Sequence, residues 1–186
     1  KIAENILGFD IKEISFDKKS EKINSTNITQ PAIFINSVIK NLILKEKNII
    51  PKAVAGHSLG EFSALVSADV LTFEDALEII KIRSEEMHAA GKVNPGSMAA
   101  VIGANESQLD KLCNQKETVV VANYNSDNQV VISGTKSGIN NAIEISKKIG
   151  VKRIIKLNVS GAFHSPLMKF AREKLKNIIN NTTFKK

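Results

Sequence analysis

The sequence predicts an α/β protein in two parts, and two observations carry that prediction. Residues 96 to 159 alternate between apolar runs and amphipathic segments in the order β-α-β-β-α-β, which is typical of a ferredoxin-like module. Gly56-His57-Ser58-Leu59-Gly60 follows an apolar run that ends at Ala55 and precedes an amphipathic segment that opens at Glu61. A Gly-x-Ser-x-Gly between a strand and a helix is typical of a tight elbow that exposes a serine hydroxyl. Ser58 is therefore the first candidate site residue, as a nucleophile.

The first part should consist of helices and one strand, each with its own local signal. Gly8 ends a first helix, Pro31 favours the first turn of a second, and acidic residues after Thr72 favour a long third helix that Gly91 ends. The expected elements are a helix over residues 1 to 7, a polar loop over 17 to 29, a helix from Pro31, a buried strand over 49 to 55, and helices over 61 to 68 and from Thr72.

One charged residue lies on the apolar stripe of the long third helix. Arg83 is three residues after Ile80 and four before Met87, so its guanidinium should point toward the interior. A buried charge needs an anionic partner. Arg83 therefore either reaches the rim or pairs with a structural carboxylate, or it binds a substrate carboxylate through a bidentate contact.

The second part is bounded by signals of the same kind. The expected elements are strands over residues 97 to 103, 118 to 124, 129 to 133 and 151 to 159, with helices over 106 to 116 and 137 to 149. The chain then returns through a loop over 160 to 166 to a last helix over 167 to 180.

Composition narrows the class of protein. With 42% hydrophobic and 24% charged residues in 186, the chain should be soluble and globular, with no membrane span and no signal peptide. The formal charge of +7 comes with scattered lysines, one tyrosine and no tryptophan, which favours an acidic protein partner over nucleic acid. The single cysteine, Cys113, is read as a small core residue.

A serine nucleophile needs a base, and three histidines are available. His57 lies inside the elbow, where its side chain diverges from that of Ser58, and His88 lies one residue off the apolar stripe. His164 lies in a loop after a strand and before a Ser-Pro helix start, where loops commonly carry function. His164 is therefore the candidate base.

At this point four ordered motifs together resemble one family. They are Gly56 to Glu61, Arg83 with Met87 one turn on, Asn123-Tyr124-Asn125 with Gln129 to Gly134, and Gly161 to Met168. Their residues and separations closely resemble the malonyl-CoA:acyl carrier protein transacylase family over essentially the whole chain. The resemblance implies an α/β-hydrolase-like core with a ferredoxin-like subdomain inserted between nucleophile and base. Residues 1–95 and 160–186 would then belong to the catalytic core and residues 96–159 to the insertion.

The resemblance also implies roles for single residues in malonyl transfer, the step that supplies extender units for fatty acid synthesis. Ser58 would be the acylated nucleophile, His164 its general base and later acid, and the Leu59 N–H an oxyanion donor. Arg83 would bind the malonyl carboxylate, with Met87 one turn on. Phe163 before the base and Leu59 after the nucleophile are similar to the pattern for malonyl rather than methylmalonyl units. No metal and no cofactor is implied.

The partners implied are malonyl-CoA and an acidic acyl carrier protein. A basic cluster could receive the carrier, and we define it as Lys147, Lys148, Lys152, Arg153 and Lys156. A solvated lysine-rich surface, inflated by the codon bias of an AT-rich genome, is the alternative reading of that cluster.

The chain also departs from the family. A Gly-Gln-Gly loop before the first helix and a Gln after the last are not found, so the chain is expected to be truncated at both ends. The alternatives are an ordinary serine hydrolase such as a thioesterase, or a non-catalytic module that docks carrier protein. The expected compartment is a plastid-type organelle of a eukaryote, or else a bacterial cytoplasm.

Overall fold

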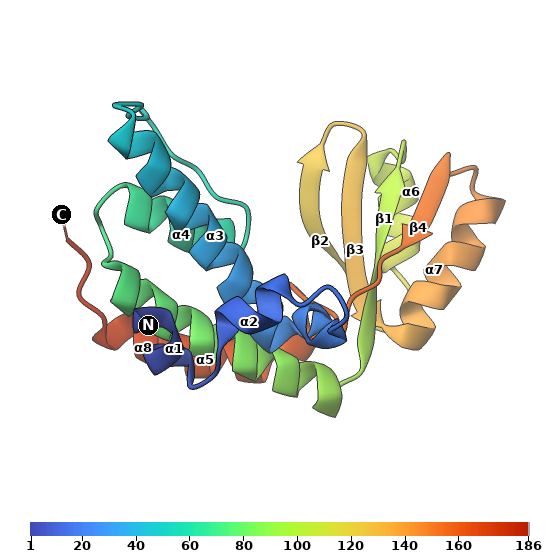
Figure 1. The fold of residues 1–186 in the computed structure, drawn as a ribbon. Helices are drawn as coiled ribbons and strands as arrows, with labels where there is room; N and C mark the ends of the chain where they lie inside the picture. The colour runs from blue at the N-terminus through green and yellow to red at the C-terminus, as the bar shows by residue number, and fades with distance from the viewer. Residues whose placement is uncertain (186) are drawn as a thin grey trace. The chain divides into compact units, whose positions relative to one another are not determined.

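The structure is a computed structural model in which residues 1–185 are described. It has a mixed α/β fold with a small antiparallel sheet, as the sequence predicts (Figure 1). The chain divides into two compact units, the first formed by Lys1–Glu86 with Glu173 onward and the second by Met87–Arg172. Each unit is described on its own.

The first unit is helical. Its elements are α1 (Ile2–Leu7), α2 (Ile11–Phe16), the short 3-10 helix η1 (Glu21–Asn24), α3 (Thr26–Glu46), α4 (Gly60–Ser67), the first two thirds of α5 (Phe73–Val93) and most of α8 (Lys169–Asn181). Two predicted helix signals are confirmed. Gly8 ends α1 with a left-handed φ of 81°, and the Thr72 hydroxyl accepts a hydrogen bond from the Asp75 N–H at 3.0 Å.

Helix α3 begins earlier than predicted. Pro31 does not open this helix but lies inside it, because the chain already turns helical at Thr26. A proline cannot donate to the carbonyl four residues before it, which here belongs to Asn27. That carbonyl lies 3.5 Å from the Ser84 hydroxyl of α5, which donates to the Lys81 carbonyl at 2.9 Å. The proline therefore leaves a backbone acceptor of α3 close to α5.

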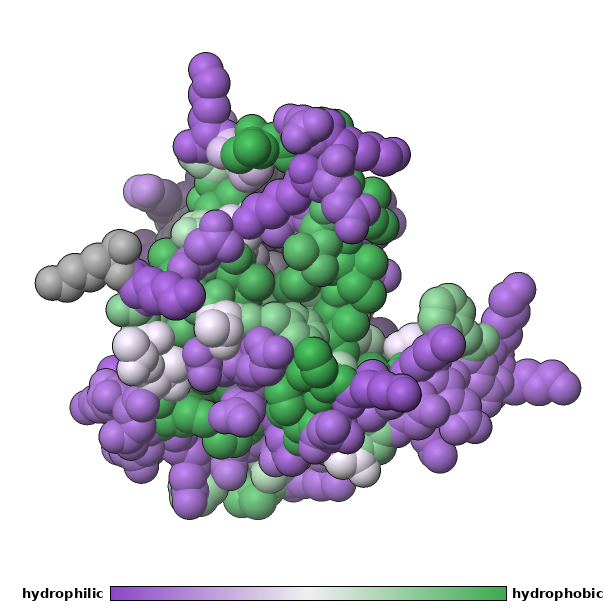
Figure 2. Space-filling view, turned by 60° about the vertical axis from the view of Figure 1, so that its left-hand side comes forward, coloured by the Kyte–Doolittle hydropathy of each residue, from purple (hydrophilic) through white to green (hydrophobic). Residues whose placement is uncertain are grey.

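The predicted buried strand over residues 49 to 55 is wrong. No β-ladder within residues 1–185 includes this segment, and its apolar side chains are exposed, Ile50 by 74%. A run of apolar residues becomes a strand only where neighbouring strands satisfy its backbone N–H and C=O groups. Leu42 and Ile43, near the end of α3, are also exposed apolar residues. Figure 2 shows patches of hydrophobic surface between the hydrophilic side chains.

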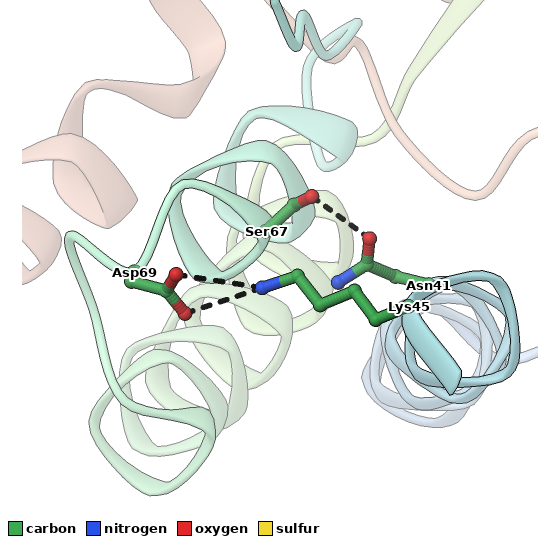
Figure 3. A network of polar contacts seen from close by, with 4 residues as sticks. All are labelled: Asn41, Lys45, Ser67 and Asp69. Carbon is green, nitrogen blue, oxygen red and sulfur yellow. Dashed lines mark hydrogen bonds and ion pairs between the residues drawn. The ribbon is translucent and has the colours of Figure 1, made fainter. Parts of the chain in front are cut away.

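A polar network joins α3 to the end of α4 (Figure 3). Asn41 and Lys45 lie one helical turn apart on α3, so both side chains face the same way. The Ser67 hydroxyl donates to the Asn41 Oδ1 at 2.9 Å, and the Lys45 Nζ lies 3.3 Å from the Asp69 Oδ1. This network fixes the far end of the helix that follows the Ser58 elbow.

The core of the first unit forms between α3, α4 and α5. Phe34, Leu77, Ile79 and Ile80 are fully buried within it. The ring of Phe34 stacks on that of Phe73 at 5.6 Å between centroids, which locks α3 against the first turn of α5.

The second unit contains a four-stranded antiparallel sheet. Its elements are the end of α5, β1 (Gly96–Ile102), α6 (Glu106–Cys113), β2 (Val119–Ser126), β3 (Gln129–Thr135), α7 (Lys136–Lys148), β4 (Arg153–Lys156), the 3-10 helix η2 (Pro166–Met168) and the start of α8. The strand order in the sheet is β2-β3-β1-β4. The predicted β-α-β-β-α-β order is confirmed.

One face of this sheet packs on α6 and α7 (Figure 1). Ala99, Val101 and Ile132 from the strands meet Leu112 of α6 and Ile139 of α7, and each is at most 1% exposed. Cys113 packs against this cluster, and burial raises the pKa of its thiol, as expected of a core cysteine.

The prediction that Gly91 ends helix α5 is wrong, because the helix continues to Val93. The glycine serves a close approach instead, since a Cβ at Gly91 would lie 2.8 Å from the Ser160 carbonyl oxygen. Within residues 1–185, no helix is long and apolar enough to cross a membrane.

Candidate active site

The predicted elbow at Ser58 is present. Ser58 has a left-handed φ of 52°, which few residues other than glycine adopt. A Cβ at Gly56 would lie 2.0 Å from the Gly60 carbonyl carbon and 2.1 Å from the Glu61 nitrogen. The chain therefore folds back on itself so tightly that only glycine fits at position 56, and the turn runs directly into α4.

The two glycines of the motif are not equivalent. A Cβ at Gly60 would meet no atom within 4 Å. Close backbone approach therefore requires glycine at position 56 but not at position 60.

Alanine substitutions should separate the two glycines. Gly56→Ala forces a methyl group into backbone atoms and should lower the free energy of unfolding by about 1–3 kcal/mol. Gly60→Ala places a better helix former in the first turn of α4 and should be neutral or stabilising by up to about 1 kcal/mol. Urea unfolding followed by circular dichroism measures both, and equal losses would contradict the geometry of the elbow.

The Leu59 N–H has no hydrogen-bond acceptor among residues 1–185. Leu59 precedes α4 as its N-cap, and the N–H groups at a helix start have no partner within the helix. The next N–H along the chain, that of Gly60, donates to the His57 carbonyl at 3.0 Å. A backbone donor next to a nucleophile is what an oxyanion requires.

Arg83 lies beside Ser58. Its side chain is 8% exposed, which confirms the predicted inward orientation. The Arg83 Nη2 donates to the Ser58 Oγ at 2.9 Å, and the Nη1 donates to the Oε1 of Gln30 on α3. The first unit therefore brings together the predicted nucleophile and the predicted carboxylate-binding residue.

The charge of Arg83 has no close counterion. Within residues 1–185, no carboxylate lies within 4.0 Å of its guanidinium. Burial lowers the pKa of Arg83, and the nearby Glu61 carboxylate partly offsets that effect. The structural ion pair considered as one reading of Arg83 is therefore not found, although an arginine stays charged at this site.

Gln30 is the site residue that the sequence analysis missed. It lies on the buried face of α3 one turn before Phe34, so it is a polar residue on an apolar stripe, as Arg83 is on α5. The expected helix start at Pro31 left Gln30 just outside the helix and hid this signal.

The remaining predicted site residues lie in the second unit. His164 has a left-handed φ of 57° and an exposed side chain. The following residue fixes its loop, because the Ser165 hydroxyl donates to the Ala162 carbonyl at 2.6 Å and accepts from the Leu167 N–H at 3.3 Å. His164 is therefore presented on a constrained turn at the start of η2.

Met87 and Phe163 belong to one small apolar cluster of the second unit. Both are partly buried and pack against Ala90, Met168 and Ala171. The cluster joins the end of α5 to the loop that carries His164.

The basic cluster on α7 and β4 is exposed at all five positions. Lys147 pairs with Glu144 at 2.7 Å, and Lys156 donates to the Asn140 side chain at 3.2 Å. Arg153 and Lys156 belong to β4, which is an edge strand of the sheet. As for metal chemistry, residues 1–185 hold no group of three His, Cys, Asp or Glu side chains that could bind an ion.

Comparison with known proteins identifies a matching family and several relatives of this chain. The model of the acyl transferase domain family matches residues 2–186. The malonyl CoA-acyl carrier protein transacylase of Staphylococcus aureus (strain COL) is 42% identical over 182 residues, which cover 96% of this chain and 58% of the relative.

Two solved structures are also similar. The malonyl-CoA:ACP transacylase of Synechocystis sp. PCC 6803 shares 37% identity with a TM-score of 0.86, covering 98% of this chain and 60% of that one. A malonyl-transacylase in complex with its type II PKS acyl-carrier protein shares 36% identity with a TM-score of 0.92, covering 99% and 61%. The chain thus spans about three fifths of the length of these relatives.

Proposed function

Because this chain belongs to the acyl transferase domain family, we propose that it carries out malonyl transfer from malonyl-CoA to the phosphopantetheine thiol of acyl carrier protein, for fatty acid synthesis. The names of the Staphylococcus and Synechocystis relatives support this substrate. The observation that carries the proposal is the hydrogen bond from Arg83 to the Ser58 hydroxyl.

That hydrogen bond indicates which acyl group the serine accepts. Malonyl bears a carboxylate one methylene beyond the carbonyl that the serine attacks. A buried guanidinium 2.9 Å from the serine oxygen, with no carboxylate of residues 1–185 in ion-pair range, is placed to bind it. A neutral acyl group such as acetyl would leave the guanidinium without an anion, which disfavours it.

In the first half-reaction, the Ser58 Oγ attacks the thioester carbonyl while the His164 imidazole takes its proton. The Leu59 N–H donates to the oxyanion of the tetrahedral intermediate, a contact worth on the order of 3 kcal/mol. The C–S bond then breaks, and the CoA thiolate leaves with the proton from His164. The product is a malonyl ester of Ser58.

In the second half-reaction, His164 deprotonates the carrier's thiol, which attacks the ester carbonyl. The C–O bond breaks, and the Ser58 Oγ recovers its proton from His164. Met87 and Phe163 are proposed as substrate-binding residues, and Phe163 with Leu59 as determinants of the preference for malonyl over methylmalonyl.

We assign the finer fold in the same way. Residues 1–95 and 160–186 are proposed to be parts of an α/β-hydrolase-like catalytic subdomain, which the Gly56 to Gly60 elbow supports. Residues 96–159 are proposed to form a ferredoxin-like subdomain, which the strand order β2-β3-β1-β4 supports. A full-length structure whose core lacks a sheet beside the Ser58 elbow would contradict the hydrolase-like assignment.

The carrier is proposed to dock on the basic cluster of α7 and β4. Carrier proteins are acidic, and exposed cations steer an acidic partner toward its site. The complex of a related transacylase with its carrier protein supports carrier docking in general.

Initial-rate assays test transfer and docking together. With malonyl-CoA and carrier protein varied, the plots should be parallel lines, the product should be malonyl-carrier, and free malonate should be minor. Lys152→Glu with Arg153→Glu should raise the KM for carrier at least about tenfold at low salt, and less at high salt. The KM for malonyl-CoA should stay within about threefold.

A double variant of Lys111→Glu on α6 and Lys116→Glu just after it makes the same change in net charge at exposed positions of the same unit. It should leave the KM for carrier near the unmodified value. Equal effects of the two double variants would place the docking surface elsewhere, and release of malonate to water as the main product would indicate a hydrolase.

The compartment is proposed to be a plastid-type organelle, with a bacterial cytoplasm as the alternative. The lysine-rich composition fits either source, and the relative from Staphylococcus aureus is bacterial. A gene with a transit-peptide leader upstream of this chain would support the organelle, and a bacterial operon would contradict it.

A further inference from the structure

We infer that Gln30 is a positioning residue that holds the Arg83 guanidinium at the Ser58 hydroxyl without neutralising it, and thereby sets the preference for acyl groups that carry a carboxylate. This inference rests on the proposed function and adds a residue to it. Three observations carry it, and each concerns the first unit alone.

Gln30 lies in a buried, packed turn. It is 8% exposed and lies in the interior of α3, one turn before the fully buried Phe34. The stack of Phe34 on Phe73 fixes α3 against α5 on one side of Gln30. On the other side, the Asn27 carbonyl, which Pro31 frees, lies 3.5 Å from the Ser84 hydroxyl of α5. The turn that carries Gln30 therefore packs closely on the turn that carries Arg83.

Gln30 binds one of the two terminal nitrogens of the Arg83 guanidinium. The Arg83 Nη1 donates to the Gln30 Oε1, while the Nη2 donates to the Ser58 Oγ. A planar guanidinium with one nitrogen fixed has little rotational freedom left. Its five N–H donors outnumber these two contacts, so a carboxylate can still be bound by two of them.

Gln30 is also neutral, and the charge of the side chain at position 30 decides which ligands Arg83 can bind. A carboxylate at position 30 would pair with the guanidinium and satisfy its charge inside the protein. An amide orients the same group and leaves its charge for a ligand. The nearby carboxylate, that of Glu61, is exposed on α4 and outside ion-pair range, so it neutralises Arg83 little.

The test compares two ligands in a background that cannot turn over. In chains carrying Ser58→Ala, dissociation constants for malonyl-CoA and acetyl-CoA are measured by titration calorimetry. Adding Gln30→Glu, which keeps the shape but supplies a charge, should reduce the preference for malonyl-CoA at least about tenfold. The dissociation constant for acetyl-CoA should stay within about threefold, because acetyl makes no ionic contact with Arg83.

Two further variants make the result specific. Gln30→Met keeps the length and removes the acceptor, so it should also lower malonyl-CoA affinity, here by releasing the guanidinium. Asn180→Asp makes the same charge change as Gln30→Glu at an exposed position of α8 and should leave both constants unchanged. Circular dichroism spectra and melting temperatures identify any variant that fails to fold, and Gln30→Met then stands in for Gln30→Glu.

An unchanged malonyl preference in both Gln30 variants would overturn the inference while leaving the proposed function intact. Parallel loss of both ligands in a folded variant would also overturn it, since Gln30 would then be only structural. If the Ser58→Ala chain itself shows no preference for malonyl-CoA, the proposed carboxylate-binding role of Arg83 is contradicted. The positioning role of Gln30 is then contradicted as well.

Discussion

Replacing Ser58 by alanine should abolish malonyl transfer while leaving the fold intact. The hydroxyl is the proposed nucleophile, and the elbow accommodates the smaller side chain because the tight approach lies at Gly56. Removing a nucleophile leaves no route to the acyl-enzyme, so the transfer rate should fall by at least about 10⁴-fold. Transfer is measured with radiolabelled malonyl-CoA and carrier protein.

Ser63→Ala provides a matched control on the adjacent helix. The Ser63 hydroxyl is buried and has no hydrogen-bond partner within residues 1–185, so its removal should cost no stability and little activity. His164→Ala belongs to the same series and should slow acylation at least about 100-fold, as loss of a positioned base does. Residual transfer by Ser58→Ala at more than a few per cent of the normal rate would assign the nucleophile elsewhere.

Replacing Arg83 by alanine should change which acyl group is transferred. Loss of a buried ionic contact should lower the malonyl-to-acetyl ratio of kcat/KM by at least about 100-fold. Most of the change in this ratio should come from slower malonyl transfer, so that acetyl transfer rises relative to malonyl transfer. Competition between malonyl-CoA and acetyl-CoA for the chain, with product analysis by mass spectrometry, measures the ratio directly.

Lysine should rescue the Arg83→Ala loss poorly, because an ammonium cannot contact Gln30, the serine and a carboxylate in one plane. Arg172→Ala removes an exposed arginine of α8 and is the matched control. An unchanged acyl ratio in Arg83→Ala would make Arg83 a structural residue.

The order of elements in the second unit could be predicted from the sequence, although β4 (Arg153–Lys156) is shorter than the strand expected over residues 151 to 159. Its strands alternate with helices whose signals are local, such as the Asn105 capping box of α6 and the Thr135 N-cap of α7. The elbow was equally local, because the clash at Gly56 involves residues only four and five positions away.

The errors lie where structure depends on distant residues. Apolar residues at 49 to 55 favour a strand, but a strand needs partners, and periodicity does not supply them. Pro31 favours a helix start, yet the turn from Thr26 to Gln30 packs on the core and extends α3 backward.

The site was half predictable for the same reason. Arg83 stood out as a charge on an apolar stripe, which the burial confirms. Its contact with Gln30 spans 53 residues of sequence, and no local pattern indicates it. The motif at Ser58 predicted the candidate nucleophile, whereas Gln30, the proposed positioning residue, could be found only from the packing of α3 on α5.

The central claim is that Ser58 carries the malonyl group between its two thiol partners. Intact-mass spectrometry of the chain after malonyl-CoA, followed by peptide mapping and then by addition of carrier protein, tests it most directly. The account predicts one malonyl adduct that maps to Ser58, persists in buffer and moves to the carrier when it is added. An adduct on another residue, an adduct that water removes before carrier arrives, or no adduct at all would contradict it.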